Sequence, residues 1–337
     1  MQLTSGIQVI ETEFWGRPLY LALFVDEQVA LVDTGLVGMG ETDVIPCMRS
    51  LGKSSEDLSL IINTHAHADH IGGNRELWLA SGKRARFAAH RMDVPWIEDP
   101  PSQGPGLYQR YVDLGLIEAA SLADSLKAAG EGTKVDLVLE GDERFALGQD
   151  LELRIVSAPG HTLGNISVYE PASKVLVHGE SVAGRGQFDT NGKLLGVPSY
   201  DDVGAYLETV ARLARMDFVW FVSSHVPPMK CDAAAKYFAE SLEFALGFDA
   251  EVQNRLRSAT GALSTLDLLG SMEDLWGEYP ADTGMAMLID AHLRSLLNRG
   301  VIHGSLEDGV TWEDSEDNRF EALVEAARSA VAALSEP

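Results

Sequence analysis

Cysteine, long apolar runs and positive charge are what this sequence has least of. Its 337 residues include two cysteines, Cys47 and Cys231, which lie far apart in the chain. Such a pair is no disulfide framework, so we expect reduced thiols and a cytoplasmic location. The first sixteen residues hold neither a basic start nor an uninterrupted apolar segment, so we expect no secretory signal. No apolar run approaches the length that spans a bilayer.

Positive charge is scarce relative to negative charge. The chain has 26 Lys and Arg against 51 Asp and Glu, and its formal net charge is −25. This charge repels phosphate backbones and anionic lipid surfaces, so we expect no nucleic acid and no membrane as partner. The apolar fraction of 45% is ordinary for a globular core, and the length fits one large domain and a smaller one.

The most informative stretch is 58–73, LSLIINTHAHADHIGG. Its apolar start predicts a buried strand, which ends just before His65, His67, Asp69 and His70. Side chains two residues apart in an extended segment point the same way, so the first two histidines can grip one ion together. The other two residues can then face a second ion. Imidazole and carboxylate suit zinc, with manganese or iron as substitutes, so the pattern predicts a metal site rather than a polar loop.

This order of residues resembles the signature of the metallo-β-lactamase superfamily of metal-dependent hydrolases. Four further motifs extend the resemblance over roughly two thirds of the chain: Asp33-Thr34-Gly35, Pro159-Gly160-His161-Thr162, Gly179-Glu180 and Ser223-Ser224-His225. The resemblance implies an α/β fold, a four-layer αββα sandwich over residues 1–231. A smaller, mainly helical domain would follow over residues 232–337.

The resemblance also implies two divalent metal ions and the residues that hold them. Asp69 would be both a ligand and the catalytic residue that orients the nucleophile and passes a proton to the leaving group. Asp33 would hold the metal loop by hydrogen bonds. The implied ligands are His65, His67 and His161 for the first ion, Asp69, His70 and His225 for the second, and Glu180 between or beside them.

Glu180 departs from the family pattern, which usually has Gly-Asp at this point. The additional methylene moves the carboxylate outward by roughly 1.5 Å, whereas zinc–oxygen distances stay near about 2.0–2.2 Å. Either the strand end lies further back, or Glu180 binds one ion only, or the second ion is weaker. We still expect Glu180 to be a ligand; the alternative is a strand-end acid that is hydrogen-bonded to a loop.

Candidate substrate contacts are aromatic. The segment 91–117 is rich in proline and glycine, which forbids a long helix in its first half. Such segments are often lids or pocket walls, so Trp96 and Tyr108 are candidates. Tyr200, at the start of an expected helix over 201–215, is a third. The alternative is ordinary packing, under a surface loop or at the helix start.

The last third of the chain is predicted to be helical, over 233–258, 263–276 and 282–299, with a short hairpin behind the last helix. Helix and hairpin resemble the winged-helix tail of the lactamase-beta-2-like branch of the superfamily. A nucleic-acid reader needs a basic recognition helix, whereas this tail is acidic. We therefore expect a cap, a homodimer contact or a pocket wall.

The sequence thus predicts a hydrolase that uses a metal-bound hydroxide on a small-molecule acyl substrate: a carboxylic ester, thioester or lactone. Two alternatives are a phosphodiesterase or endoribonuclease of the same fold, and a metal-binding protein with an impaired second metal site. Redox use of a di-iron centre is a third, but it would place Glu in the first motif, where Ala66 or Ala68 stands.

Overall fold

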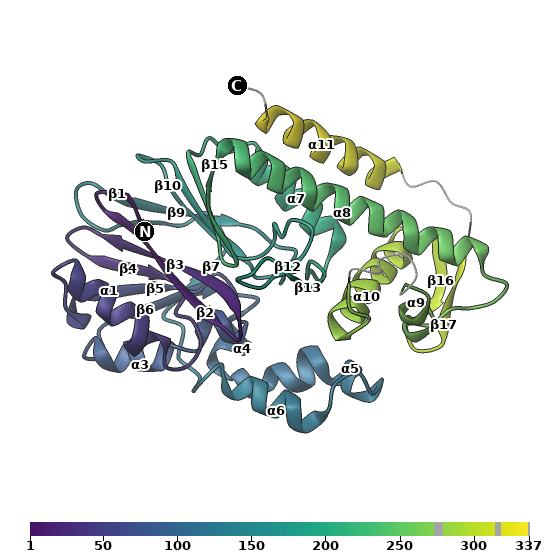
Figure 1. Cartoon of the computed structure of the whole chain (residues 1–337), viewed down its shortest axis with the longest axis horizontal. Coiled ribbons are helices and arrows are strands. Elements are labelled where there is room, and N and C mark those ends of the chain that lie inside the picture. The colour runs from purple at the N-terminus through teal and green to yellow at the C-terminus, as the bar shows by residue number, and fades with distance from the viewer. Residues whose placement is uncertain (273–278, 314–317, 336–337) are drawn as a thin grey trace. The chain divides into compact units, whose positions relative to one another are not determined.

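The computed structural model describes residues 1–272, 279–313 and 318–335 (Figure 1). Contacts within the chain divide it into two compact units. The first unit consists of Met1–Ala158, Gly164–Gly179 and Asp217–Lys230, and the second of Pro159–Leu163, Glu180–Met216 and Cys231–Pro337. The domain boundary expected between residues 231 and 232 stays a prediction.

The first unit contains a seven-stranded sheet in which the strands follow chain order. The first four strands pair antiparallel, and the remaining strands pair parallel. The strands are β1 (Gln2–Thr4), β2 (Ile7–Phe14), β3 (Arg17–Val25), β4 (Val29–Val32), β5 (Leu58–Ile62), β6 (Arg86–His90) and β7 (Leu137–Leu139).

A six-stranded sheet, in the order β15-β14-β11-β10-β9-β8, completes the strands of this unit. Strands β9 and β11 both pair antiparallel with β10, and β11 pairs parallel with β14, so β9, β11 and β14 run in the same direction. The strands are β8 (Arg144–Ala146), β9 (Glu152–Ser157), β10 (Ile166–Glu170), β11 (Val175–His178), β14 (Trp220–Ser223) and β15 (Val226–Lys230).

Strand β3 shows why the first sheet is buried on both faces. Its sequence, RPLYLALFV, is a continuous apolar run, and successive side chains of a strand point to opposite faces. One set packs in the core that the two sheets share, and the other packs against the helices outside the first sheet. The two sets are Tyr20, Ala22 and Phe24, and Leu19, Leu21 and Leu23.

Short helices cover the outside of this sheet and fill the irregular segment 91–117. Over residues 91–102 no helix is longer than five residues, which agrees with the proline content of that stretch, whereas η4 and α5 follow each other without a break. The helical elements of the unit are η1 (Gly40–Val44), α1 (Ile45–Ser50), η2 (Ser55–Asp57), α2 (Ala68–Ile71), α3 (Asn74–Ala80), α4 (Val94–Glu98), η3 (Pro100–Ser102), η4 (Gly104–Tyr108), α5 (Gln109–Asp113) and α6 (Ala119–Lys127).

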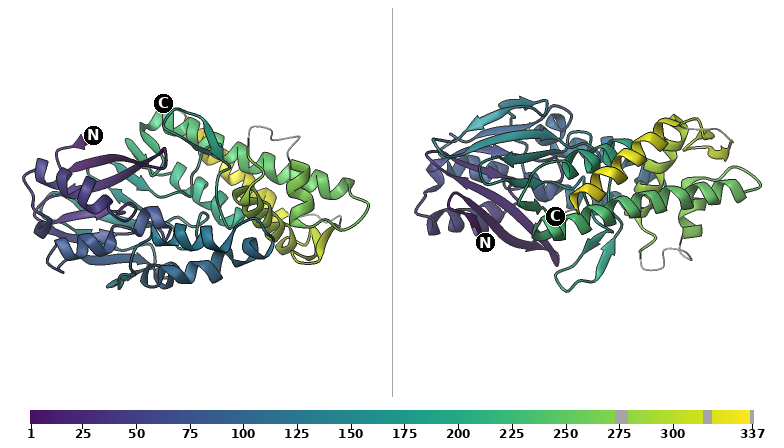
Figure 2. Two further views of the ribbon diagram at one scale, coloured as in Figure 1. Left: turned by 60° about the horizontal axis from the view of Figure 1, so that its bottom comes forward. Right: turned by 90° about the horizontal axis from the view of Figure 1, so that it is seen from above.

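The second unit is mainly helical, and α11 lies along α7 and α8 (Figures 1 and 2). Asp202 and Asp282 cap the N-termini of α7 and α10 by accepting hydrogen bonds from backbone N–H groups, so these helices begin directly after a polar residue. The elements are β12 (Gln187–Phe188), β13 (Leu194–Gly196), α7 (Val203–Ala214), α8 (Cys231–Ser258), α9 (Thr265–Met272), α10 (Thr283–Asn298), β16 (Ile302–Ser305), β17 (Gly309–Trp312) and α11 (Asn318–Leu334).

The predicted C-terminal helices agree with α8, α9 and α10, and the predicted hairpin is β16–β17. The end of the helix expected over 263–276 lies outside the described residues. Among the helices that the structure describes, none is long and apolar enough to cross a membrane.

Candidate metal centre

The predicted site residues follow the carboxyl ends of five strands. Strands β4 and β5 are parallel neighbours, and β9, β11 and β14 run in one direction, so within each sheet these ends lie at one edge. In each sheet this arrangement brings residues that are far apart in sequence to one edge of that sheet. Asp33 follows β4, His65 to His70 follow β5, His161 follows β9, Glu180 follows β11 and His225 follows β14.

The loop after β5 changes from extended to helical. His67 has extended backbone angles, and α2 begins at the next residue and carries Asp69 and His70. The Nε2 atom of His65 lies 3.1 Å from Nδ1 of His67, and the other ring nitrogen of His65 lies 3.1 Å from the Thr64 hydroxyl. The two facing nitrogens are therefore placed to share one cation.

Asp33 anchors this loop by hydrogen bonds. Its backbone has φ of 61°, a left-handed conformation that Asp tolerates better than most residues. Its buried carboxylate accepts hydrogen bonds from Thr64 N at 2.7 Å, from the Thr64 hydroxyl at 2.8 Å and from His70 Nδ1 at 2.8 Å. Because Nδ1 of His70 donates to Asp33, its Nε2 atom faces the other way, 3.5 Å from Asp69 Oδ2.

The Asp69 carboxylate lies between two histidines. His225 Nε2 is 3.3 Å from Asp69 Oδ2, and His225 Nδ1 donates to the Pro18 carbonyl at 2.9 Å. Burial alone would raise the pKa of Asp69, but the charges of His70 and His225 and their hydrogen bonds outweigh burial and hold this pKa well below its usual range. Likewise, burial would lower the pKa of His70, but Asp69 and Asp33 raise it.

His161 and Glu180 form the remaining pair. The Nδ1 atom of His161 donates to the Ser199 carbonyl at 2.7 Å, and its backbone N–H donates to the Ser181 hydroxyl at 3.0 Å. Its Nε2 atom lies 3.6 Å from Glu180 Oε1. Both side chains are almost fully buried, so both ligand atoms are held in fixed directions.

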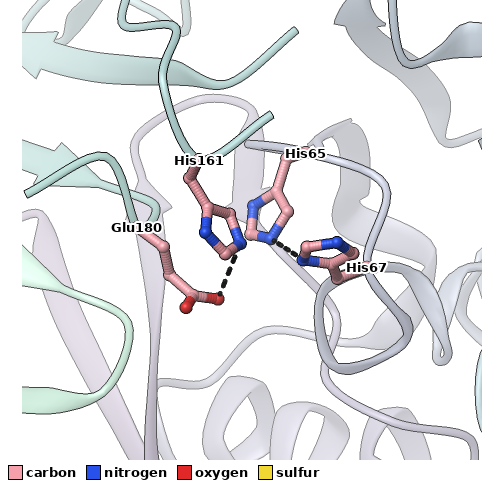
Figure 3. A group of neighbouring side chains, drawn as sticks. All are labelled: His65, His67, His161 and Glu180. Atoms are coloured by element: carbon pink, nitrogen blue, oxygen red, sulfur yellow. Dashed lines mark hydrogen bonds and ion pairs between the residues drawn. The ribbon is translucent and has the colours of Figure 1, made fainter. Parts of the chain in front are cut away.

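Two groups of side chains each offer ligand atoms that lie within 4.8 Å of one another. Figure 3 shows the side chains of the first group pointing toward one another. Buried and half-buried imidazoles and carboxylates in such groups fit a divalent transition metal. The first group is His65, His67, His161 and Glu180, and the second is Asp69, His70, Glu180 and His225.

The three candidate substrate contacts differ in their surroundings. Trp96 lies on α4 and packs partly against a small buried cluster, and Tyr108 is half-buried at the end of η4. Tyr200 is 2% exposed, its hydroxyl lies 2.9 Å from His292 Nε2, and its ring stacks on Tyr206. The structure therefore favours the packing interpretation for Tyr200, and substrate contact at Trp96 and Tyr108 stays a prediction.

Several residues that support the site were not found from the sequence. Asn63 donates to the His70 carbonyl at 3.0 Å, and its side chain pairs with Asn74. A polar pair such as Asn63-Thr64 directly after an apolar strand is a signal that could have pointed to them. The Pro18 and Ser199 carbonyls leave no such signal, because any residue has a carbonyl.

The sequence of the chain is similar to one superfamily profile and to several hydrolases. The profile of the metallo-beta-lactamase superfamily matches residues 18–225. The hydroxyacylglutathione hydrolase of Cereibacter sphaeroides is 30% identical over 158 residues, which are 44% of this chain and 46% of that protein. The chain therefore spans less than half of that relative's length.

Longer matches have lower identity. The hydroxyacylglutathione hydrolase of Rhodobacter capsulatus is 27% identical over 259 residues, 76% of this chain and 78% of that protein. A probable metallo-hydrolase of Bacillus subtilis is 26% identical over 246 residues, 68% of this chain and 82% of that protein.

Solved structures show the same fold over nearly the whole chain. A metallo-beta-lactamase family protein from Thermus thermophilus superimposes with a TM-score of 0.71 at 18% identity, covering 93% of this chain and 100% of that one. A beta-lactamase domain protein from Burkholderia ambifaria gives a TM-score of 0.66 at 17% identity, covering 93% of each chain. The predicted α/β fold with a helical C-terminal region is thereby confirmed, and the chain belongs to the metallo-beta-lactamase superfamily.

Proposed function

We propose that this protein is a metal-dependent hydrolase of acyl thioesters. The observation that carries the proposal is the pair of ligand groups that share Glu180, because this arrangement suits two neighbouring ions. The choice of thioester over ester or lactone rests on the relatives named hydroxyacylglutathione hydrolase.

The proposed cofactors are two divalent ions, zinc or else manganese or iron. When bound, such ions lower the pKa of water toward neutrality and polarise an acyl carbonyl. The proposed ligands are those of the two groups: His65, His67 and His161 for one ion, Asp69, His70 and His225 for the other, and Glu180 for both.

Asp69 is the proposed catalytic residue. Its lowered pKa keeps the carboxylate ionised near neutral pH, where it accepts hydrogen bonds. An ionised carboxylate can orient an attacking water and carry its proton to the departing thiolate. The fixed Nδ1–H bonds of His70 and His225 hold the imidazoles on either side of this carboxylate.

The proposed substrate is a small molecule with an apolar acyl part. At the turn between β2 and β3, Phe14 contacts the His225 ring edge-on, and the neighbouring Trp15 is 71% exposed. An exposed Trp beside the site offers apolar surface to an acyl group. Trp96 and Tyr108 are proposed as further contacts.

Other features fit this proposal. The charge of −25 opposes a phosphodiesterase or endoribonuclease, and the presence of Glu180 in both groups opposes an impaired second metal site. Neither cysteine forms a disulfide, in keeping with a proposed cytoplasmic location. The C-terminal region is proposed as a cap or homodimer contact.

A substrate panel tests the proposal. The zinc-loaded protein is assayed on a hydroxyacyl thioester of glutathione, p-nitrophenyl esters, a lactone and bis-p-nitrophenyl phosphate, with metal-free protein as control. We expect kcat/KM for the thioester to exceed the other values by about tenfold or more, which corresponds to about 1.4 kcal/mol of transition-state stabilisation. Preference for the phosphodiester would overturn the proposal.

A further inference from the structure

A buried polar chain runs through the second unit and includes none of the proposed ligands. The Tyr200 hydroxyl lies 2.9 Å from His292 Nε2, and His292 Nδ1 lies 3.2 Å from Asp249 Oδ1. Arg299 Nη1 donates to both Asp249 oxygens at 3.2 Å. Tyr200, His292 and Asp249 are each at most 4% exposed. Buried polar groups of this kind are costly unless they are fully hydrogen-bonded.

The direction of the hydrogen bonds follows from the chemistry of each group. Burial alone would raise the pKa of Asp249, but the hydrogen bond from His292 and the charge of Arg299 outweigh it and lower this pKa. The ionised carboxylate therefore accepts from Nδ1–H of His292. With that proton on Nδ1, the Nε2 lone pair of His292 accepts from the Tyr200 hydroxyl.

Tyr200 is joined to the loop that carries His161. The carbonyl of the preceding residue, Ser199, accepts the Nδ1–H of His161 at 2.7 Å. On the other side of Tyr200, the Asp201 N–H donates to the Gly160 carbonyl at 2.7 Å. The segment 199–201 thus holds the His161 loop at two points, and Tyr200 is its buried anchor.

The ring of Tyr200 is also held in place by packing. It stacks on the Tyr206 ring with centroids 4.3 Å apart. The Gly160 backbone lies against the same residue, because a Cβ on Gly160 would come within 2.7 Å of Tyr206 Cα. The Tyr200 side chain is therefore held by Tyr206 as well as by His292.

We propose that Tyr200, held by His292 and Asp249, is a positioning residue for His161: it fixes the Ser199 carbonyl, and so the tautomer and direction of the His161 ring. The proposal deepens the proposed function, since it rests on His161 being a metal ligand. Hydrogen-bond partners of ligating histidines typically change metal affinity by about 10–100-fold when they are lost.

The test compares Tyr200→Phe with Thr265→Val. The first change removes one hydroxyl and keeps the stacked ring. The second removes a different buried hydrogen bond of the same unit, from the Thr265 hydroxyl to Asp290 Oδ1. Zinc affinity is measured by competition with a chromophoric chelator, and unfolding by calorimetry. We expect Tyr200→Phe to weaken zinc binding about tenfold, and Thr265→Val to leave it within about twofold at similar loss of thermal stability.

A second measurement needs no metal. In metal-free protein labelled with ¹⁵N at histidine, the proposal expects a slowly exchanging Nδ1–H signal from His161, and faster exchange in Tyr200→Phe. Its absence from the wild type would overturn the proposal, as would equal zinc affinity in Tyr200→Phe and wild type, or an equal loss in Thr265→Val. If Tyr200→Phe does not fold, Asp249→Asn takes its place with the same expectations. Failure of the wild type to hydrolyse thioesters would count against the proposed function alone.

Discussion

Glu180 is the residue that both ligand groups share, and it stands where the superfamily resemblance implies Asp. A longer carboxylate reaches further from the strand end, so we expect the distances within this site to suit Glu rather than Asp. The Nε2 of His161 lies 3.6 Å from Glu180 Oε1, a separation that leaves room for a cation bound to both atoms.

We therefore expect Glu180→Asp to lose metal rather than gain it. Shortening the side chain by roughly 1.5 Å withdraws the carboxylate from both groups, so metal analysis should fall from about two ions per chain to about one. Glu180→Gln, which keeps the length and removes the charge, is the matched control and should also lose metal. A rise in metal content or activity in Glu180→Asp would mean that Glu is a handicap in this site.

Because the pKa of Asp249 is lowered in the folded protein, we expect the stability of the fold to depend on pH. Burial opposes its ionisation, yet the His292 hydrogen bond and the Arg299 charge lower its folded-state pKa below the ordinary value of 3.8. A depressed pKa stabilises the fold above the unfolded-state pKa, and this contribution is lost as pH falls through the folded-state pKa. The difference in urea midpoint between wild type and Asp249→Asn should therefore be constant above about pH 5 and shrink at lower pH. A difference that grows on acidification would contradict the assignment.

Of the individual residues, the sequence predicted the candidate metal ligands, because they stand in recognisable motifs. It did not predict a residue such as Tyr200, whose proposed effect on His161 passes through the Ser199 backbone carbonyl. The seven ligand candidates stand in short motifs, and the structure brings all seven into the two groups. The role of Tyr200 was not predictable, because its partners His292 and Asp249 lie far away in the sequence and carry no local signature.

Among the elements, the loop between β9 and β10 is tightly constrained at Gly160. Gly160 has φ of 140°, and a Cβ there would lie 2.7 Å from Tyr206 Cα. Only glycine meets both conditions, so the loop that carries His161 depends on this residue.

Gly160→Ala should accordingly destabilise the fold and weaken metal binding. Gly192 is the matched control, because it also has a positive φ, 79°, but a Cβ there would meet nothing within 4 Å. Gly192→Ala should cost about 1–2 kcal/mol from backbone strain alone, whereas Gly160→Ala adds a steric clash. Calorimetry and zinc competition measure both effects, and equal losses in the two variants would show that the close contact with Tyr206 is unimportant.

Most elements were predictable from periodicity and turn residues, with shifts of one or two residues at their ends. The helix expected over 233–258 is α8 (Cys231–Ser258), and the helix expected over 201–215 is α7 (Val203–Ala214). Asp202 explains the second shift: its side chain accepts from Ala205 N–H, so Asp202 is the cap and the helix begins at the next residue. Periodicity alone does not fix which residue serves as the cap.

For the whole molecule, the charge of −25 is the dominant long-range property. Excess negative charge repels itself in the compact state, and salt screens this repulsion. Raising the ionic strength from about 0.01 M to 0.2 M, where the Debye length falls from about 30 Å to below 10 Å, should therefore raise the melting temperature by a few degrees. Sucrose at matched osmolality controls for effects that do not involve charge. A melting temperature that falls with salt would show that attractive ion pairs outweigh the repulsion.

The overall fold was predictable because its signature motif is specific, and the profile match over residues 18–225 agrees with it. The order of the strands in the two sheets was not. Pairings such as β11 with β14, or β4 with β5, join segments that lie tens of residues apart, and no local pattern encodes them.

A strand whose carboxyl end leads to a candidate metal ligand has its amino end on the far side of the sheet, where an insertion would lie far from that ligand. Gln149 and Asp150, in the turn that precedes β9, are both exposed, and the six residues of β9 separate them from the His161 loop by about 20 Å. A reporter peptide spliced into this turn would tether the protein to a sensor chip without touching any group that would hold a cation.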